Sequence, residues 1–267
     1  MSKNESKKKN AIADFRVKLD KKAKQSKAWS VAIKAFWVFI FALWVAAVLY
    51  ATQYMIAFFL IRILKINTDV LSSNMIQAAY SVVVYALALA ITIFVPWKIA
   101  KCKTTRDELG LRGLPTWTDV LIAPIGFVVS TIVAAFLLLV MQKILPGINW
   151  EQSQEVGYSN LIATSEFFGA FVCLVILAPI VEEIIFRGWL YGKLRARIPA
   201  IPAMLVVSAL FGIVHGQWNV GVTVFVMSMV MCTVRELTGT IWGGILIHMI
   251  KNGVAFYILY VNPMMIQ

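Results

Sequence analysis

Seven long apolar segments constrain the fold of this chain more than any other feature of its sequence. They lie at residues 35–64, 76–97, 118–141, 165–192, 203–217, 219–234 and 240–261. A helix needs about 20 apolar residues to cross the hydrocarbon core of a bilayer. Apolar residues fill 60% of the 267 positions, against roughly 45–50% in soluble domains. We therefore expect an all-α, polytopic transmembrane helix bundle with about seven spans, within a range of six to eight.

Positive charges in the connecting segments predict which side of the membrane each connection faces. Segments 98–117 and 193–201 carry five and three Lys or Arg residues, whereas segment 142–162 carries one Lys and two Glu. Basic connections stay on the cytoplasmic side of a membrane. We expect the N-terminus and the two basic segments to be cytoplasmic and segment 142–162 to be outside.

The N-terminal segment holds most of the chain's net charge. Its first 27 residues contain ten Lys or Arg and three acidic residues, and so carry +7 of the chain's +12. A basic surplus confined to a tail indicates contact with anionic lipids of the inner leaflet, and we expect no nucleic-acid partner. We expect residues 1–34 to form a basic cytoplasmic tail, unfolded or lying on the membrane surface, and residues 35–267 to form the transmembrane domain.

Acidic and basic side chains interrupt the apolar segment 165–192. Glu182, Glu183 and Arg187 lie within it, although a charged group at the centre of a membrane helix costs roughly 2.5–3.5 kcal/mol on insertion scales. Glu183 and Arg187 are four residues apart, so they share a helix face and can pair. Glu182 points about 100° away from Glu183 and is left for another role.

The two histidines of the chain, His215 and His248, also lie in apolar segments. Asn252 follows His248 by four residues and shares its helix face. Residues 215–219 interrupt the apolar stretch 203–234, which indicates either a tight turn or a polar patch inside the membrane. A single buried histidine is usually a packing residue, but two at a depth matching adjacent glutamates indicate a functional site.

These residue types suit hydrolysis of an amide bond. A glutamate beside a histidine can deprotonate water, and His248 with Asn252 could donate hydrogen bonds to a developing oxyanion. Zn²⁺ is the alternative, with Glu182, His215 and His248 as its ligands. The HExxH spacing of common zinc proteases is absent from the sequence.

Three motifs in the last third of the chain resemble those of a known protease family. They are EExxxR at residues 182–187, followed by Gly188, FxxxH at residues 211–215, and HxxxN at residues 248–252. In this order they resemble the CPBP family of intramembrane proteases, also called the CAAX-protease and bacteriocin-processing (Abi) family. Segment 107–113, DELGLRG, resembles a stretch upstream of these motifs in members. The resemblance places the protease core at about residues 118–262.

The resemblance implies a helical bundle with a polar intramembrane cavity that opens toward the inner leaflet. It implies Glu182 as the general base with His215, and His248 with Asn252 as stabilisers of the oxyanion. The implied catalytic set is Glu182, Glu183, His215, His248 and Asn252, with Arg187 and Phe211 in supporting roles. From its residue type alone, Phe211 is an aromatic packing residue.

We therefore expect an intramembrane endopeptidase, a metalloprotease by family name, that cleaves membrane-associated peptides or proteins in a bacterial cell membrane. One alternative is a non-catalytic interaction or bacteriocin-immunity protein with the same fold. Another is a transporter that uses Glu and His as a proton relay, although the chain lacks the repeated halves that many transporters show.

Overall fold

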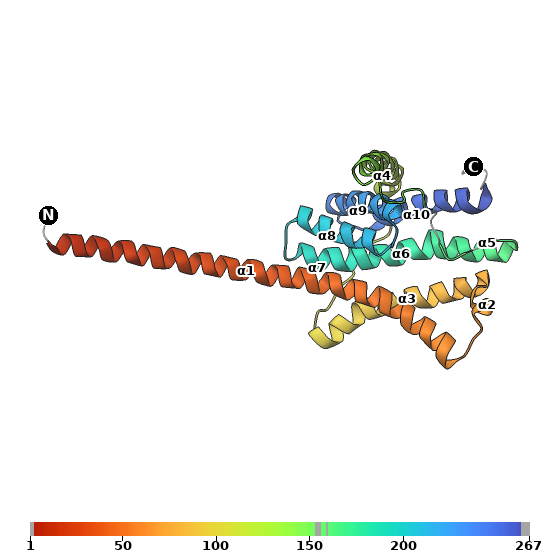
Figure 1. Cartoon of the computed structure of the whole chain (residues 1–267), viewed down its shortest axis with the longest axis horizontal. Coiled ribbons are helices and arrows are strands. Elements are labelled where there is room, and N and C mark those ends of the chain that lie inside the picture. The colour runs from red at the N-terminus through yellow and green to blue at the C-terminus, as the bar shows by residue number, and fades with distance from the viewer. Residues whose placement is uncertain (1–2, 153–155, 159, 263–267) are drawn as a thin grey trace. The chain divides into compact units, whose positions relative to one another are not determined.

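The computed structural model describes residues 3–152, 156–158 and 160–262, and its regular structure in these ranges is entirely helical (Figure 1). The α-helices are α1 Lys3–Phe58, α2 Thr68–Leu71, α3 Asn74–Ala100, α4 Trp117–Ile144, α5 Thr164–Phe171, α6 Ala178–Glu183, α7 Tyr191–Arg195, α8 Ala200–Ile213, α9 Trp218–Thr238 and α10 Trp242–Phe256. The π-helical segments are η1 Phe59–Ile63, η2 Val172–Leu177, η3 Ile184–Leu190 and η4 Tyr257–Val261.

The chain divides into two compact units, Met1–Phe41 and Ala42–Gln267. Helix α1 begins at Lys3, so the expectation of an unfolded tail is wrong for the described part of the first unit. Lys and Ala recur through this stretch, and both have high helix propensity. Contact of the basic tail with lipid stays a prediction, as does the boundary at residues 34 and 35.

Six helical segments are long and apolar enough to cross a membrane, which falls within the predicted range. They are Trp29–Ile63, Asn74–Ala100, Trp117–Ile144, Thr164–Arg195, Trp218–Thr238 and Trp242–Val261. The difference from seven comes from segment 203–217, which forms the 14-residue helix α8. At 1.5 Å per residue, α8 is about 21 Å long, shorter than the roughly 30 Å hydrocarbon core.

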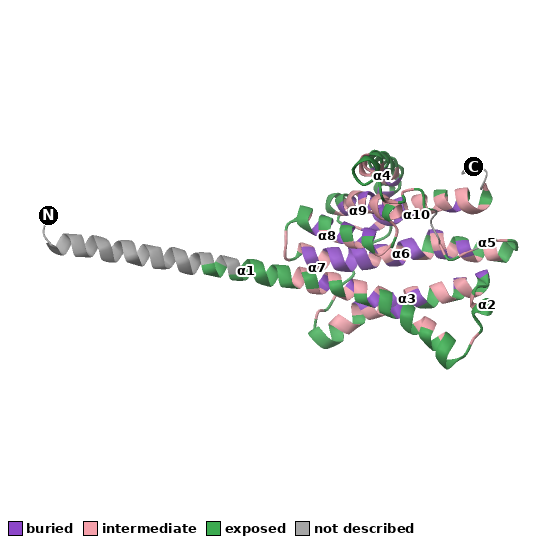
Figure 2. Cartoon of the chain, viewed as in Figure 1, coloured by how far each residue is buried: buried purple, intermediate pink, exposed green. Residues whose placement is uncertain are grey.

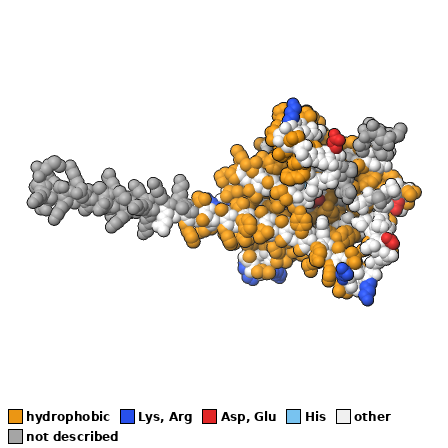
Figure 3. All heavy atoms as spheres, in the orientation of Figure 1, with side chains coloured by type: hydrophobic (Ala, Val, Ile, Leu, Met, Phe, Trp, Pro, Cys, Tyr) orange, Lys and Arg blue, Asp and Glu red, His pale blue; other side chains and the backbone are white. Residues whose placement is uncertain are grey.

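Helix α4 shows how these helices pack: its small residues face the protein and its large residues face outward. Its buried positions are Asp119, Ala123, Gly126, Ser130 and Ala134. Leu121, Ile125, Ile132 and Phe136 are between 64% and 68% exposed. Small residues at helix contacts and large apolar residues toward lipid are typical of membrane proteins. The space-filling view shows this apolar surface over most of the visible face (Figure 3).

The interior of the second unit is built around α9 and α10. Helix α9 packs against α4 and α8, and α10 packs against α4, η2 and α6. Helices α8 and α9 approach closely at Gly212 and Gly221, since a Cβ atom on Gly212 would lie 2.8 Å from the carbonyl oxygen of Gly221. This contact fixes the end of α8, and with it the turn that follows.

Residues 164–195 form one helical run from α5 to α7, with η2 and η3 inside it. Segment η3 is buried at every position from Ile185 to Leu190, and Figure 2 shows buried residues gathered along this run. Glu182 and Glu183 end α6, immediately before η3. Single π-helical turns are frequent at functional sites.

Candidate active site

A cavity of about 350 Å³ in the second unit collects most of the polar side chains singled out from the sequence. Its polar lining includes Tyr85, Glu182, His215, His248, Lys251 and Asn252. These side chains come from α3, α6, the turn after α8, and α10. Four of the five expected catalytic residues therefore reach one space, and the fifth, Glu183, lies directly behind it.

Glu183 is fully buried and joins two of the motifs. Its Oε1 accepts a hydrogen bond from Nη1 of Arg187 at 2.8 Å and another from Nδ1 of His248 at 3.1 Å. The pairing of Glu183 with Arg187 expected from their spacing is therefore present. We assign the hydrogen to Nδ1 of His248 because a carboxylate paired with arginine only accepts. Nε2 of His248 is then left for the cavity.

A glycine of α10 makes room for the buried carboxylate of Glu183. A Cβ atom on Gly244 would lie 3.1 Å from Oε2 of Glu183, which is closer than an ordinary carbon–oxygen contact. Oε2 accepts no hydrogen bond from the residues that the structure describes. Gly244 therefore determines how closely α6 and α10 approach at the site.

Glu182 faces the cavity, with its side chain 18% exposed. Its Oε1 accepts a hydrogen bond from the hydroxyl of Tyr85 at 3.0 Å, and its Oε2 lies 3.9 Å from Nε2 of His248. Tyr85 was missed in the sequence because it lies 97 positions earlier, in an apolar segment where tyrosine is unremarkable. The carboxylate of Glu182 thus points into the cavity, whereas that of Glu183 is buried and held by hydrogen bonds.

His215 lies in the turn after α8, not inside a membrane helix as expected. The break in the apolar stretch is thus a turn at residues 214–217, after which α9 begins at Trp218, and Gly216 is in the left-handed region at φ 71°. Nδ1 of His215 lies 2.6 Å from the carbonyl oxygen of Phe211. A carbonyl oxygen only accepts, so we assign the hydrogen to Nδ1. Nε2 of His215 is then the ring atom left for other partners.

Phe211 is a packing residue, as its residue type indicates, and it packs at the centre of the cluster. It is fully buried, and its ring centroid lies 4.2 Å from Cζ of Arg187, 4.9 Å from the ring of His215 and 5.8 Å from the ring of His248. The guanidinium over its face is a cation–π contact. Phe211 therefore packs against both histidine rings.

Asn252 lines the cavity but also anchors the helix that carries it. Its Nδ2 donates a hydrogen bond to the carbonyl oxygen of Leu174 in η2 at 2.8 Å. An asparagine amide has two N–H donors, so one remains for a ligand.

Residues 164–254 match the family described as Type II CAAX prenyl endopeptidase Rce1-like. This region is a CAAX-protease domain. It contains all three motifs. The six apolar helices outside and inside this region indicate an integral membrane protein. Neither the comparison with curated proteins nor the comparison with solved structures gave a match.

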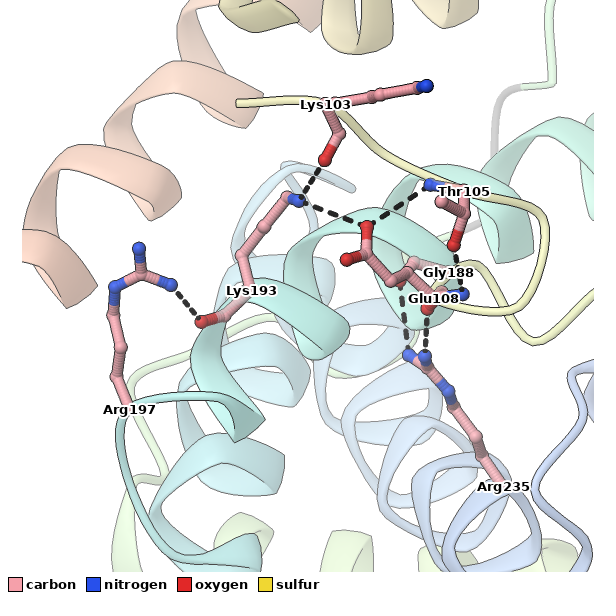
Figure 4. Close-up of polar contacts among 7 residues, drawn as sticks. All are labelled: Lys103, Thr105, Glu108, Gly188, Lys193, Arg197 and Arg235. Atoms are coloured by element: carbon pink, nitrogen blue, oxygen red, sulfur yellow. Dashed lines mark hydrogen bonds and ion pairs between the residues drawn. The ribbon is translucent and has the colours of Figure 1, made fainter. Parts of the chain in front are cut away.

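The loop between α3 and α4, residues 101–116, packs against the helical run that carries Glu182. Nη2 of Arg235 donates to the carbonyl oxygen of Glu108 at 2.7 Å, and its Nη1 donates to that of Gly188 at 3.2 Å (Figure 4). Nζ of Lys193 lies 3.5 Å from Oε2 of Glu108. A Cβ atom on Gly188 would meet the carbonyl oxygen of Leu109 at 3.2 Å. The segment DELGLRG thus packs against the glycine that follows the EExxxR motif.

The same loop fixes the start of α10 in the CAAX-protease domain. The backbone N–H of Ile241 donates to the carbonyl oxygen of Gly110 at 3.0 Å. Asp119 is buried and forms a capping box with Thr116 at the start of α4, and it also accepts from the hydroxyl of Thr240 at 3.3 Å. These contacts fix the start of the helix that carries His248.

Glu182, His215 and His248, the ligands of the zinc alternative, are not grouped as a metal site in the described part of the CAAX-protease domain. In the described ranges there is no group of three His, Cys, Asp or Glu side chains placed to hold a metal ion. We therefore derive the chemistry from the glutamates and histidines, without a step through a metal.

Proposed function

We propose that this protein is an intramembrane endopeptidase that hydrolyses peptide bonds of membrane-associated peptides or protein segments with water activated by Glu182. The observation that carries the proposal is that the adjacent carboxylates of Glu182 and Glu183 lie in different environments. Glu183 is held by Arg187 and His248, whereas Glu182 faces a cavity that two histidines share. Two carboxylates in different environments are a common arrangement for separate catalytic roles.

Glu182 and His215 together suit the activation of water. In this scheme one hydrogen of the water is directed at the Glu182 carboxylate and the other at Nε2 of His215. Glu182 takes a proton as the water oxygen bonds to the carbonyl carbon of the substrate. The hydrogen bond from Tyr85 holds Oε1 of Glu182 in place, so that the carboxylate is oriented before substrate arrives.

The oxyanion that forms next requires hydrogen-bond donors. In this proposal Nε2 of His248 donates when the ring is doubly protonated, and the second N–H of Asn252 adds another donor. The proton on Glu182 then passes to the leaving nitrogen as the carbon–nitrogen bond breaks. Glu183 orients His248 without touching the substrate.

The substrate class is proposed from the family and from the membrane setting. Relatives are described as prenyl endopeptidases, so prenylated C-terminal segments are one class to test. Short apolar peptides are the other, because the cavity belongs to a protein whose surface faces lipid. We further propose a bacterial cell membrane with the N-terminus in the cytoplasm.

The test is cleavage of a panel of apolar and prenylated peptides by purified protein in detergent. Replacing Glu182→Gln removes the base and should lower the rate about 10²- to 10⁴-fold, and His215→Ala should lower it substantially. The matched control is Glu151→Gln, which changes an exposed glutamate outside the cavity and should cleave like the wild type.

Two outcomes would count against the proposal. Equal cleavage by wild type and Glu182→Gln would remove Glu182 from the chemistry. Wild type that cleaves nothing would favour the non-catalytic interaction or immunity protein. A metal chelator added to each reaction separates glutamate-driven attack, which should resist it, from metal-dependent attack.

A further inference from the structure

Lys251 is a cationic side chain in the cavity that the proposed chemistry does not use. It lies three residues after His248 on α10, so the two share a helix face and both line the cavity. Within residues 3–152, 156–158 and 160–262, its ammonium forms no hydrogen bond and no ion pair within 4.0 Å, although the charge of Glu182 acts on it from farther away. Lys251 is half-buried, and an ammonium that is partly removed from water is costly unless it is paired.

The other charged groups at the site already have contact partners. Arg187 is bonded to Glu183, and Glu182 accepts from Tyr85 with His248 nearby. The close partner that Lys251 lacks among the described residues can therefore come from a ligand. The position of Lys251, one helical turn from His248, puts that ligand group next to the proposed site of bond cleavage.

We infer that Lys251 is a specificity-determining residue that binds the C-terminal carboxylate of a peptide substrate. The inference rests on the proposed function. Acidic side chains are rare in apolar, membrane-associated peptides because of their insertion cost, whereas every linear peptide with an unmodified end carries a terminal carboxylate. An ammonium and a carboxylate make a charge-assisted hydrogen bond, which is stronger than a neutral one.

The test compares two peptides that differ only at the C-terminus, one with a free carboxylate and one with a carboxamide. Wild type should prefer the free acid by about 10- to 100-fold in kcat/KM. Lys251→Gln should bring the acid-to-amide ratio close to one, and Lys251→Arg should keep the preference for the acid. Because each ratio is measured within one preparation, differences in folding or insertion between variants cancel.

The matched control is Lys143→Gln, which removes an exposed lysine from α4 outside the cavity and should keep the wild-type ratio. If wild type cleaves both peptides equally and Glu182→Gln cleaves neither, the proposed function stands and the inference falls. Abolished cleavage of both peptides by Lys251→Gln and Lys251→Arg would assign Lys251 to the chemistry and overturn its role in recognition. If wild type cleaves neither peptide, the proposed function fails and the inference falls with it.

A lipid phosphate is the other anion within reach of a membrane cavity. Titration with phosphatidylglycerol in the same detergent distinguishes it from the peptide carboxylate. Inhibition of wild type but not of Lys251→Gln, with an acid-to-amide ratio of one, would assign Lys251 to lipid and overturn the inference. A preserved ratio at every lipid concentration supports the carboxylate.

Discussion

Each member of the buried Glu183–Arg187 pair is tolerated in the protein interior only while the other is present. Both side chains are at most 1% exposed, so the loss of one leaves the other charged and uncompensated. Arg187→Met should destabilise the protein by about 3–5 kcal/mol. The double variant Glu183→Gln with Arg187→Met should recover much of this stability but not the activity, because His248 loses its charged acceptor. Unfolding in detergent and peptide cleavage measure the two effects.

An exposed ion pair provides the comparison for that prediction. Arg112 and Asp107 lie 3.8 Å apart, with side chains 63% and 72% exposed. Arg112→Met should therefore change stability by less than about 1 kcal/mol. If Arg187→Met proves no more destabilising than Arg112→Met, the buried pair does not support the fold.

Gly244 gives a second prediction at the scale of a single residue. In Gly244→Ala the added methyl group would press on Oε2 of Glu183 and shift the carboxylate that orients His248. We expect kcat to fall about 10- to 100-fold. Gly253→Ala on the same helix is the control, since its Cβ atom would meet Cγ1 of Val175 at an ordinary 3.6 Å. Equal rates for the two variants would contradict the role given to Gly244.

At the scale of the elements, Arg235 connects the loop before α4 to the helical run 164–195. This side chain holds a carbonyl oxygen of each. Arg235→Met should lower stability by about 1.5–3 kcal/mol and reduce activity by loosening the run that carries Glu182. Arg195→Met breaks a half-exposed pair with Glu236 and should cost less than about 1 kcal/mol. The comparison fails if both variants lose equal stability.

At the same scale, sequence periodicity predicted the apolar helices and the pairing of Glu183 with Arg187, because both follow from spacing along one helix. It left open whether residues 215–219 form a tight turn or a polar patch, and the structure shows a turn, with His215 beyond the end of a short helix. Periodicity did not find Tyr85, because contacts between distant helices leave no local pattern. The π-helical segments were also missed, since their sequences resemble those of α-helices. The resemblance to a family supplied roles that spacing alone could not.

At the scale of the whole molecule, the charge of the basic tail leads to a prediction about membrane binding. A peptide of residues 1–28 should bind anionic vesicles and ignore neutral ones, because each Lys or Arg near such a surface contributes about 1 kcal/mol. High salt should release it. A variant peptide with four lysines replaced by glutamine should bind more weakly. Equal binding to anionic and neutral vesicles would show that apolar contacts, and not charge, hold the tail.

The backbone carbonyl oxygen that faces Nδ1 of His215 has a consequence for inhibitors. Because Nδ1 of His215 carries the hydrogen of the neutral ring and donates it to that oxygen, Nε2 of His215 is an acceptor. The side of the cavity formed by Glu182 and His215 therefore presents two acceptors, the carboxylate and Nε2, to any incoming molecule. Compounds with paired hydroxyl groups, such as hydrated ketones and boronic acids, match this pattern, whereas a planar carbonyl offers no donor. Such compounds imitate the tetrahedral stage of the reaction, and their potency should not depend on capturing a metal ion.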